Sequence, residues 1–210
     1  MKMKGFITFE GGECSGKTTV INLLKKDFEE RNIEYITTRE PGGIKISEEI
    51  RDIILNPENT LMTGETEALL YAASRMQHLA EKVIPAIKDG KVVLCDRFLD
   101  SSLVYQGVAR GLGYDNVLRV NSFALDYMPE ITFFFDVTPE VALKRMNNKD
   151  RAGKCDRLDQ EKFDFHQKVY LGYKDILEKY PNRIIRIDAE KSVDEIHKEV
   201  LDIILKYLNS

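Results

Sequence analysis

Eight consecutive residues of the sequence fit the pattern G-x-x-x-x-G-K-[ST], which runs from Gly11 to Thr18. In such a loop the glycines let backbone N–H groups turn inward around an anion, at a helix N-terminus that already favours negative charge. We expect Lys17 to reach the β- and γ-phosphates of a nucleotide and Thr18 to place its hydroxyl on Mg²⁺. The predicted phosphate site consists of Gly11, Gly12, Glu13, Cys14, Ser15, Gly16, Lys17, Thr18 and Thr19.

The segments on either side of this loop agree with the pattern. A β-branched and aromatic run, Phe6–Phe9, precedes it, and apolar residues at helical spacing follow between Lys17 and Arg31. Strand, glycine loop and helix therefore come in the order that a phosphate-binding loop requires.

Composition limits what kind of protein this is. The chain has 210 residues, 43% of them hydrophobic and 31% charged, which is near the length of one large soluble domain. A net charge of −4 provides no basic field for nucleic acid, and no apolar run approaches the roughly 18 residues of a membrane span. The first residues do not resemble a signal peptide. Because the three cysteines are scattered, we expect reduced thiols and a cytoplasmic protein.

The chain alternates strand-like and helix-like segments without a linker or repeat, so we expect a single domain over residues 1–210. After the first strand, four more are expected at Glu34–Thr38, Lys91–Cys95, Ile131–Val137 and Arg183–Asp188. Helices are expected over Lys17–Arg31, from a cap at Ser47 to Leu55, from a cap at Thr63 or Thr66 to Val83 with a kink or restart at Pro85, and over most of Asp100–Tyr127 with a break at Gly107–Gly113. Further helices are expected from Pro139 after a capping Thr138, over Gln160–Lys179, and after a capping box that begins at Ser192. Five strands alternating with helices predict a three-layer α/β domain with a mainly parallel sheet.

Charged residues follow two of the predicted strands. Asp96 and Arg97 come directly after a buried strand, and Arg39 stands between another strand and a Pro-Gly-Gly turn. Ligands bind at the carboxyl ends of parallel strands, and arginine suits bidentate contacts with phosphate. An Asn-Lys-x-Asp signature with the spacing of guanine-binding proteins is missing from the sequence. These residues favour a compact kinase over a GTPase.

Several segments together resemble one family. They are Phe9–Glu13 leading into the phosphate loop, Thr38–Gly43, Ala72–Arg75, Asp96–Phe98, Asp100–Ser102 with Tyr105–Gly107, and Asp156–Asp159. In this order they resemble bacterial thymidylate kinases, over nearly the whole chain. The resemblance implies a P-loop nucleoside monophosphate kinase fold with a lid, here about residues 146–159. It also implies Mg²⁺-dependent transfer of the γ-phosphoryl group of ATP to dTMP, giving dTDP and ADP, by a cytoplasmic homodimer.

The resemblance also implies roles for the phosphate-handling residues. Glu13 matches an acidic position that contacts the sugar 3′-hydroxyl of dTMP. Arg39 and Arg97 match arginines that hold the acceptor phosphate, and Asp96 matches a carboxylate that helps to place Mg²⁺ through water. Cys14 departs from the family, in which glycine is usual, and a positive φ there would strain a cysteine.

A second group of matched positions is expected to surround the base and sugar. Arg75 matches an arginine that hydrogen-bonds thymine, and Tyr71 falls where a phenylalanine commonly stacks on the base. Ser101 and Gln106 match residues near the base, and Tyr105 matches one beside the sugar. Pro41 belongs to the same predicted dTMP site.

The family has one form with an arginine in the phosphate loop and another with it in the lid. Positions 12–15 contain no base here, so the sequence resembles the second form. Arg151 is the best single candidate for the catalytic arginine, with Arg145 and Arg157 as competitors. We also assign Arg145 to the ATP site, and we expect Arg157 to form an ion pair with Asp156 or Asp159.

Other interpretations remain open. A related small kinase acting on a nucleoside or on another monophosphate, and a nucleotide-binding regulator without activity, share the phosphate loop. Arg39 and Arg97 favour a monophosphate acceptor. The three histidines show no metal-ligand spacing, so we take His78, His166 and His197 as structural or surface groups. The apolar side of Thr66–Val83 is the candidate dimer surface.

Overall fold

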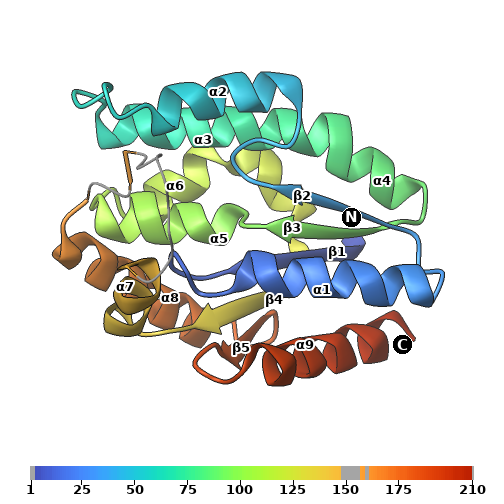
Figure 1. Cartoon of the computed structure of the whole chain (residues 1–210). Helices are drawn as coiled ribbons and strands as arrows, with labels where there is room; N and C mark the ends of the chain where they lie inside the picture. Colours follow the sequence, from blue (N-terminus) through green and yellow to red (C-terminus); the bar gives the residue numbers. More distant parts are fainter. Residues whose placement is uncertain (1–2, 148–156, 159–160, 210) are drawn as a thin grey trace.

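A five-stranded parallel sheet forms the centre of the molecule (Figure 1). The computed structural model describes residues 3–147, 157–158 and 161–209. Along the sheet the strands lie in the order β2-β3-β1-β4-β5, and each neighbouring pair is parallel. The strands are β1 (Met3–Glu10), β2 (Tyr35–Arg39), β3 (Val92–Asp96), β4 (Pro129–Asp136) and β5 (Ile184–Asp188). The five predicted strands are confirmed, with ends that differ by a few residues.

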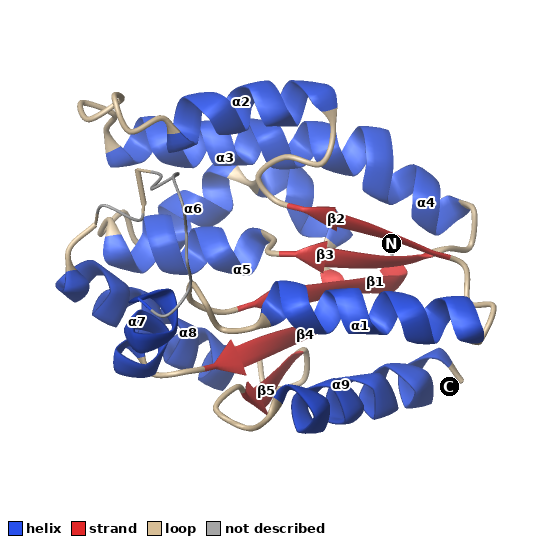
Figure 2. Ribbon diagram, in the orientation of Figure 1, coloured by secondary structure: helices blue, strands red, loops and turns tan. Residues whose placement is uncertain are grey.

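Helices cover both faces of the sheet, giving the three layers seen in Figure 2. They are α1 (Lys17–Glu30), α2 (Lys45–Leu55), α3 (Gly64–His78), α4 (Ile84–Lys88), α5 (Leu99–Ser102), α6 (Tyr114–Val120), α7 (Pro139–Asn147), α8 (Phe163–Lys179) and α9 (Val193–Leu208). Three irregular helical segments join them: η1 (Leu79–Val83) and η2 (Leu103–Ala109) have π-type hydrogen bonds, and η3 (Ser122–Tyr127) is a 3₁₀ helix. The predicted α/β class is confirmed.

Alternation along the strands sends side chains into two separate cores. In β3, Val93 and Cys95 face a core that α4, α6 and α8 help to build, whereas Val92 and Leu94 face a core that contains α1 and α9. Successive side chains of a strand point to opposite faces, so a strand buried on both faces is apolar at nearly every position. This is why the predicted central strands are continuous apolar runs rather than alternating ones.

One helix lacks the cap that the sequence predicts. α2 begins at Lys45, so Ser47 lies inside the helix, where its Oγ donates to the carbonyl of Ser74 at 2.9 Å. Ser47 is therefore not a helix cap. α7 begins at Pro139, as predicted, and the hydroxyl of the preceding Thr138 donates to Glu190 at 3.0 Å. The predicted caps at Thr63 of α3 and Ser192 of α9 are confirmed, the second as a capping box with Glu195.

Two π-type segments replace regular helix where the sequence predicts continuous helix. One of them, η1, precedes α4, and Pro85 stands near the α4 N-terminus, which confirms the predicted restart. The other, η2, follows α5 and carries Tyr105 and Gln106 toward the carboxyl edge of the sheet. The break predicted at Gly107–Gly113 is shorter in the structure: helical hydrogen bonding continues through η2 to Ala109, and residues 110–113 separate η2 from α6.

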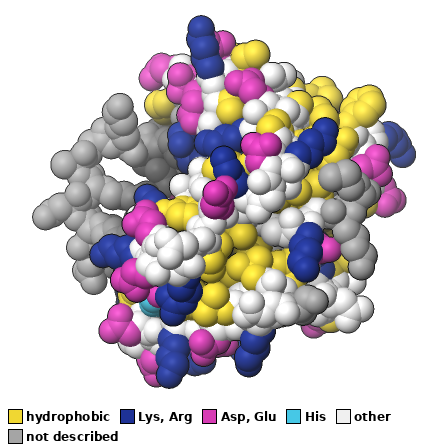
Figure 3. Space-filling model, turned by 90° about the vertical axis from the view of Figure 1, so that its right-hand side faces the viewer, with side chains coloured by type: hydrophobic (Ala, Val, Ile, Leu, Met, Phe, Trp, Pro, Cys, Tyr) yellow, Lys and Arg dark blue, Asp and Glu magenta, His cyan; other side chains and the backbone are white. Residues whose placement is uncertain are grey.

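The surface mixes acidic and basic side chains. On the face drawn in Figure 3, Lys and Arg side chains are interspersed with Asp and Glu side chains, between patches of hydrophobic ones. Among the described residues, none of the helices combines the length and the apolar character that crossing a membrane requires.

Candidate active site

A cavity of about 300 Å³ opens at the carboxyl edge of the sheet, where the phosphate loop meets the ends of β2 and β3. It extends from the start of α1 to the inner sides of α2, α3 and η2. Its lining includes Glu13, Cys14, Ser15, Gly16, Lys17, Thr18, Thr19, Arg39, Pro41, Tyr71, Arg75, Asp96, Arg97, Ser101, Tyr105 and Gln106. Residues that are far apart in the sequence thus surround one space.

The ammonium of Lys17 lies inside the phosphate loop. Nζ donates to the carbonyls of Gly11 at 3.1 Å and Gly12 at 2.9 Å, and to the hydroxyl of Ser15 at 3.1 Å. Burial, with the nearby charge of Arg97, lowers the pKa of Lys17 against the opposing effect of Asp96 and Glu13. Three neutral oxygens hold this cation at the centre of the loop, where it can face an incoming phosphate.

The loop depends on positive φ angles. Gly11 and Gly16 have φ of 142° and 98°, and a Cβ on Gly11 would lie 2.7 Å from the carbonyl oxygen of Phe135. Cys14 has φ of 54°, so the expected strain at this non-glycine position is confirmed. The path of the loop is therefore fixed by backbone geometry that few residue types adopt.

Thr18 and Asp96 meet at the start of α1 and the end of β3. The hydroxyl of Thr18 donates to Oδ2 of Asp96 at 2.9 Å. Within the described part of the chain, no group of three or more His, Cys, Asp or Glu side chains is arranged to hold a metal. Two oxygen donors beside a phosphate site fit Mg²⁺, because this ion takes few protein ligands and keeps water and phosphate oxygens.

Arg97 occupies the turn between β3 and α5 and has φ of 69°. Its Nη1 donates to the carbonyl of Gly11 at 2.8 Å, and its Nη2 donates to Oε1 of Glu13 at 2.5 Å. The guanidinium also lies 5.2 Å from the centroid of the Tyr105 ring. Arg97 therefore links the end of β3 to the phosphate loop. Its own positive charge lies at the cavity.

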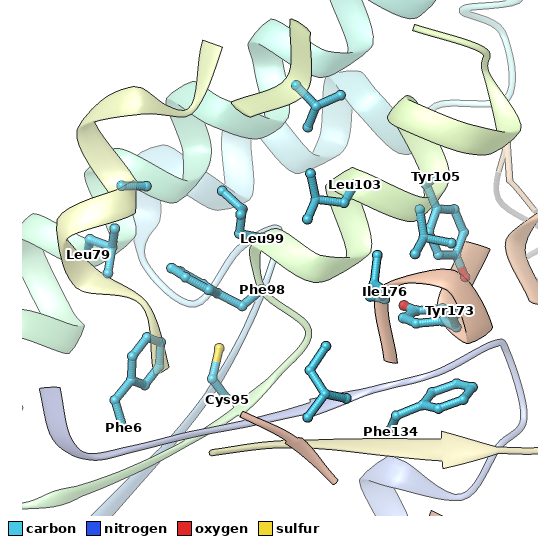
Figure 4. Packing of buried hydrophobic residues seen from close by; sticks show 14 of the residues in the cluster. Phe6, Leu79, Cys95, Phe98, Leu99, Leu103, Tyr105, Phe134, Tyr173 and Ile176 are labelled. Carbon is cyan, nitrogen blue, oxygen red and sulfur yellow. The ribbon is translucent and has the colours of Figure 1, made fainter. Parts of the chain in front are cut away.

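Glu10, the last residue of β1, is fully buried behind Arg97. It accepts hydrogen bonds from the backbone N–H groups of Phe98 and Ser101 and from the hydroxyls of Ser101 and Tyr173. Burial and the nearby charge of Asp100 raise the pKa of Glu10 to about 7. Figure 4 shows Phe98, Tyr105 and Tyr173 in the core on this side of the sheet. The ring centroids of Tyr105 and Tyr173 lie 6.5 Å apart. This acid positions the turn that carries Arg97.

Arg75 lies at the other end of the cavity and is almost entirely buried. Nε donates to Glu40 at 2.8 Å and Nη1 to Asn121 at 2.6 Å; Nη2 donates to the carbonyl of Phe98 at 3.2 Å and the hydroxyl of Ser102 at 3.1 Å. These contacts use four of its five N–H groups. The carboxylate of Glu40 also contacts His78, which is buried.

Gln106 is buried beside this arginine and is 1% exposed. Its Nε2 donates to Oε1 of Glu67 at 2.7 Å, whereas its Oε1 has no hydrogen-bond partner among the residues that the structure describes. Tyr71 of α3, half-buried, lines the same end of the cavity. Burial raises the pKa of the Tyr71 hydroxyl above its ordinary value, so that it stays neutral. An aromatic ring and an unused acceptor fit a planar ligand that carries an N–H group.

Comparison with known proteins agrees with this geometry. The family model of thymidylate kinase matches residues 9–200. The chain belongs to the thymidylate kinase family. It is 59% identical over 201 residues to a thymidylate kinase of Clostridium novyi (strain NT), covering 95% of this chain and 98% of the relative. It is 55% identical to a thymidylate kinase of Geobacillus sp. (strain WCH70), covering 92% and 93%.

A solved member of the thymidylate kinase family shares the fold. The crystal structure of thymidylate kinase from Ehrlichia chaffeensis superposes with a TM-score of 0.75 at 30% identity, covering 95% of this chain and 97% of that chain. Sequence and structure comparisons therefore identify the same family.

Not every predicted site residue lies on the cavity. Gly11 and Gly12 belong to the phosphate loop, and their carbonyls accept hydrogen bonds from Lys17, but neither residue lines the cavity. Arg145 donates to the carbonyl of Ala189 at 2.8 Å, at the end of β5. Arg157 contacts Glu67 and the carbonyl of Ile54, so its described partners differ from the expected pairing; Asp156 and Asp159 lie outside the described residues. Arg151 also lies outside them.

Three residues of this region were missed by sequence reasoning. Arg51 of α2 lines the cavity and donates to the carbonyl of Pro41 at 2.9 Å. Glu10 and Glu67 are buried acids next to the cavity-lining residues. Glu10 belongs to the segment that leads into the phosphate loop, and an acid ending an otherwise apolar strand was an available signal.

Proposed function

We propose that this member of the thymidylate kinase family transfers the γ-phosphoryl group of ATP to dTMP, giving dTDP and ADP. The observation that carries the proposal is a single cavity with a phosphate loop at one end and, at the other, the side-chain oxygen of Gln106, which has no partner among the described residues. A nucleotide acceptor needs both ends of such a cavity, because its phosphate must lie next to the phosphate donor while its base is recognised by other residues.

The acceptor phosphate lies between Arg39 and Arg97 in this proposal. Both arginines line the cavity, and Arg39 is held at its rim by Glu48 at 2.8 Å. Guanidinium groups bind phosphate through two parallel hydrogen bonds, which fixes its direction as well as its position. Glu13, which Arg97 orients, then faces the sugar 3′-hydroxyl.

The base lies between Tyr71, Arg75 and Gln106. The described contacts leave one N–H of Arg75 available, and in this proposal it donates to a pyrimidine carbonyl. The side-chain oxygen of Gln106 accepts from the ring N3–H. Tyr71 stacks on the ring face. Ser101, Tyr105 and Pro41 complete the walls of the dTMP site.

Transfer then needs positioning and charge stabilisation rather than a nucleophilic side chain. An acceptor phosphate oxygen attacks the γ-phosphorus, and the bond between that phosphorus and the bridging oxygen of ADP breaks. Lys17 turns from its loop carbonyls toward the transferring phosphate. Thr18 and Asp96 are the residues that would hold Mg²⁺, which would neutralise phosphate charge during the transfer.

Arg151 is our proposal for the catalytic arginine. Positions 12–15 of the phosphate loop contain no base. Of the competitors, Arg145 donates to the carbonyl of Ala189 and Arg157 to Glu67, and neither is among the described residues that line the cavity. This favours Arg151, with the lid taken as residues 146–159. Arg145 then serves the ATP site.

We also propose that the chain is one domain that works as a cytoplasmic homodimer. Cys14 and Cys95 are free thiols, as expected in a reducing compartment. On the outer side of α3 and η1, Leu69, Ala73 and Ala80 are exposed and Met76 is half-buried. Their spacing of four, three and four residues makes one apolar stripe, and such stripes mark contact surfaces.

A coupled assay of ADP release with dTMP, dUMP, dCMP, dGMP and AMP tests the function. We expect dTMP to be the best acceptor and dUMP the next, with about 10- to 200-fold discrimination, because one methyl contact separates these two. Turnover of AMP equal to that of dTMP would point to the related small kinase. Binding without turnover of any acceptor would point to the regulator.

A further inference from the structure

Glu67 of α3 is a buried acid whose carboxylate accepts hydrogen bonds from three neighbouring side chains. It is 1% exposed. Its Oε1 accepts from Nε2 of Gln106 at 2.7 Å and from Nε of Arg110 at 3.4 Å; its Oε2 accepts from Nη2 of Arg110 at 3.1 Å and from Nη2 of Arg157. A carboxylate has about four lone-pair sites, so these contacts use its accepting capacity.

The carboxylate of Glu67 is ionised, despite its burial. Burial acts to raise the pKa of Glu67, but hydrogen bonds from Gln106 and Arg157 and the charge of Arg110 outweigh burial and lower it. An ionised carboxylate only accepts hydrogen bonds. Whatever faces Oε1 of Glu67 must therefore be a donor.

This requirement fixes the amide of Gln106. A half-turn about the last side-chain bond would place the amide oxygen where Nε2 now lies, 2.7 Å from a carboxylate oxygen. Two acceptors at that separation repel, so the NH₂ group stays against Glu67. The oxygen of Gln106, unpartnered among the described residues, is left for the cavity that this side chain lines.

We propose that Glu67 determines which pyrimidine the enzyme accepts, by holding the Gln106 amide so that only its oxygen meets the base. This rests on the proposed function with dTMP. Thymine has an N–H donor at N3, whereas cytosine has an unprotonated acceptor there. The oxygen of Gln106 pairs with the first and repels the second. Glu67 is thus a positioning residue that acts through Gln106.

Glu67→Gln tests this role, because glutamine at 67 can donate as well as accept and so permits both orientations of Gln106. The ratio of kcat/KM for dTMP to that for dCMP is compared with the wild-type ratio. We expect the ratio to fall by about 5- to 150-fold, the cost of one mispaired buried group. An unchanged ratio in a folded Glu67→Gln protein overturns the proposal.

Arg110→Gln is the matched control. It removes one partner of Glu67 from the same cluster, yet it leaves the carboxylate facing Gln106. We expect a ratio within about threefold of wild type, since the disturbed cluster retains the acceptor that orients the amide. If Arg110→Gln lowers the ratio as much as Glu67→Gln, any disturbance of this cluster weakens the discrimination between dTMP and dCMP, and the proposal is wrong.

The wild-type enzyme separates this inference from the function on which it rests. Failure of the wild type to phosphorylate dTMP rejects the function, whereas dTMP turnover with an unaltered ratio in Glu67→Gln rejects only the inference. If Glu67→Gln does not fold, NMR of the wild type in complex with dTMP decides. The side-chain NH₂ protons of Gln106, assigned by their loss in Gln106→Glu, should show contacts to Glu67. Contacts to the thymine N3 proton instead would overturn it.

Discussion

Nη2 of Arg97 and Oε1 of Glu13 lie 2.5 Å apart, joining the turn after β3 to the phosphate loop. The same guanidinium donates through Nη1 to the carbonyl of Gly11. A planar fork can make both contacts at once, whereas an ammonium is a single point of charge. The pair therefore couples the turn at which we propose the acceptor phosphate to bind to the phosphate loop.

Arg97→Lys should lower kcat/KM for dTMP by about 10- to 100-fold, because lysine keeps the charge but loses one charged hydrogen bond. The KM for ATP should change much less. Steady-state kinetics with each substrate varied in turn measures both. Arg31→Lys, at an exposed position after α1, is the control and should match wild type. Equal loss for both substrates would contradict the assigned contact.

Glu10→Gln should make stability less dependent on pH. The folded protein raises the pKa of Glu10 from 4.5 to about 7, so the fold favours the protonated acid. Its contribution is fully present below pH 4.5 and is lost as pH rises toward and through 7, by an amount of the order of 3 kcal/mol. Urea unfolding from pH 5 to pH 8 should show this slope in wild type and a smaller one in Glu10→Gln.

Glu49→Gln makes the same chemical change at an exposed position of α2 and should keep the wild-type slope. A slope in Glu10→Gln that equals that of the control would show that Glu10 is ionised in the folded protein.

Lys17→Ala should reduce kcat by about a hundredfold or more, while the affinity for dTMP changes little. In the proposed function Lys17 contacts the transferring phosphate, so its loss would remove an interaction that strengthens in the transition state. Single-turnover chemistry and equilibrium binding of dTMP measure the two effects. Lys26→Ala, exposed on the same helix, serves as control. Intact chemistry with lost dTMP affinity would refute the role of Lys17.

Arg151→Ala should reduce kcat at least a hundredfold, with little change in dTMP binding, because an arginine delivered to the γ-phosphate contributes about 10³–10⁵ in kcat. Arg145→Ala and Arg157→Ala are made separately for comparison. A greater loss of kcat in either of these moves the role to that residue. Near wild-type kcat in all three rejects a lid arginine.

Leu69→Glu combined with Ala73→Glu should convert a dimer into a monomer, because two like-charged pairs would face each other across an apolar contact. Light scattering after size-exclusion chromatography should give about twice the chain mass of 24.2 kDa for wild type and the chain mass for the variant. Lys26→Glu, on the opposite layer, is the control. A monomeric wild type, or a variant that remains dimeric, contradicts the proposal.

Patterns confined to short segments predicted much of this molecule. The five strands and the phosphate loop depend on neighbours in the sequence, and so do the caps at Thr63 and Ser192. Asp96 and Arg97 were found because a parallel sheet brings the carboxyl ends of its strands to one edge.

The supporting residues depend on contacts that no local pattern contains. Glu10 meets Tyr173 only because β1 and α8, 163 positions apart, pack on the same face of the sheet. Glu67 is a polar residue in a helix, which by itself predicts an exposed position. It is buried because Arg110 and Arg157 come from two other segments to neutralise it. Arg51 was missed for the same reason.

The strand order has a consequence for how the chain folds during synthesis. β1 lies in the middle of the sheet, where Phe6 pairs with Val93 and Thr8 with Thr132. A ribosome therefore produces the phosphate loop well before the strands that hold β1 on either side. Contacts of such long sequence separation form slowly, and the unpaired apolar strand is prone to aggregation while it waits. β1 therefore waits for its neighbours over a longer stretch of chain than any other strand of the sheet, and its apolar side chains stay uncovered for that time.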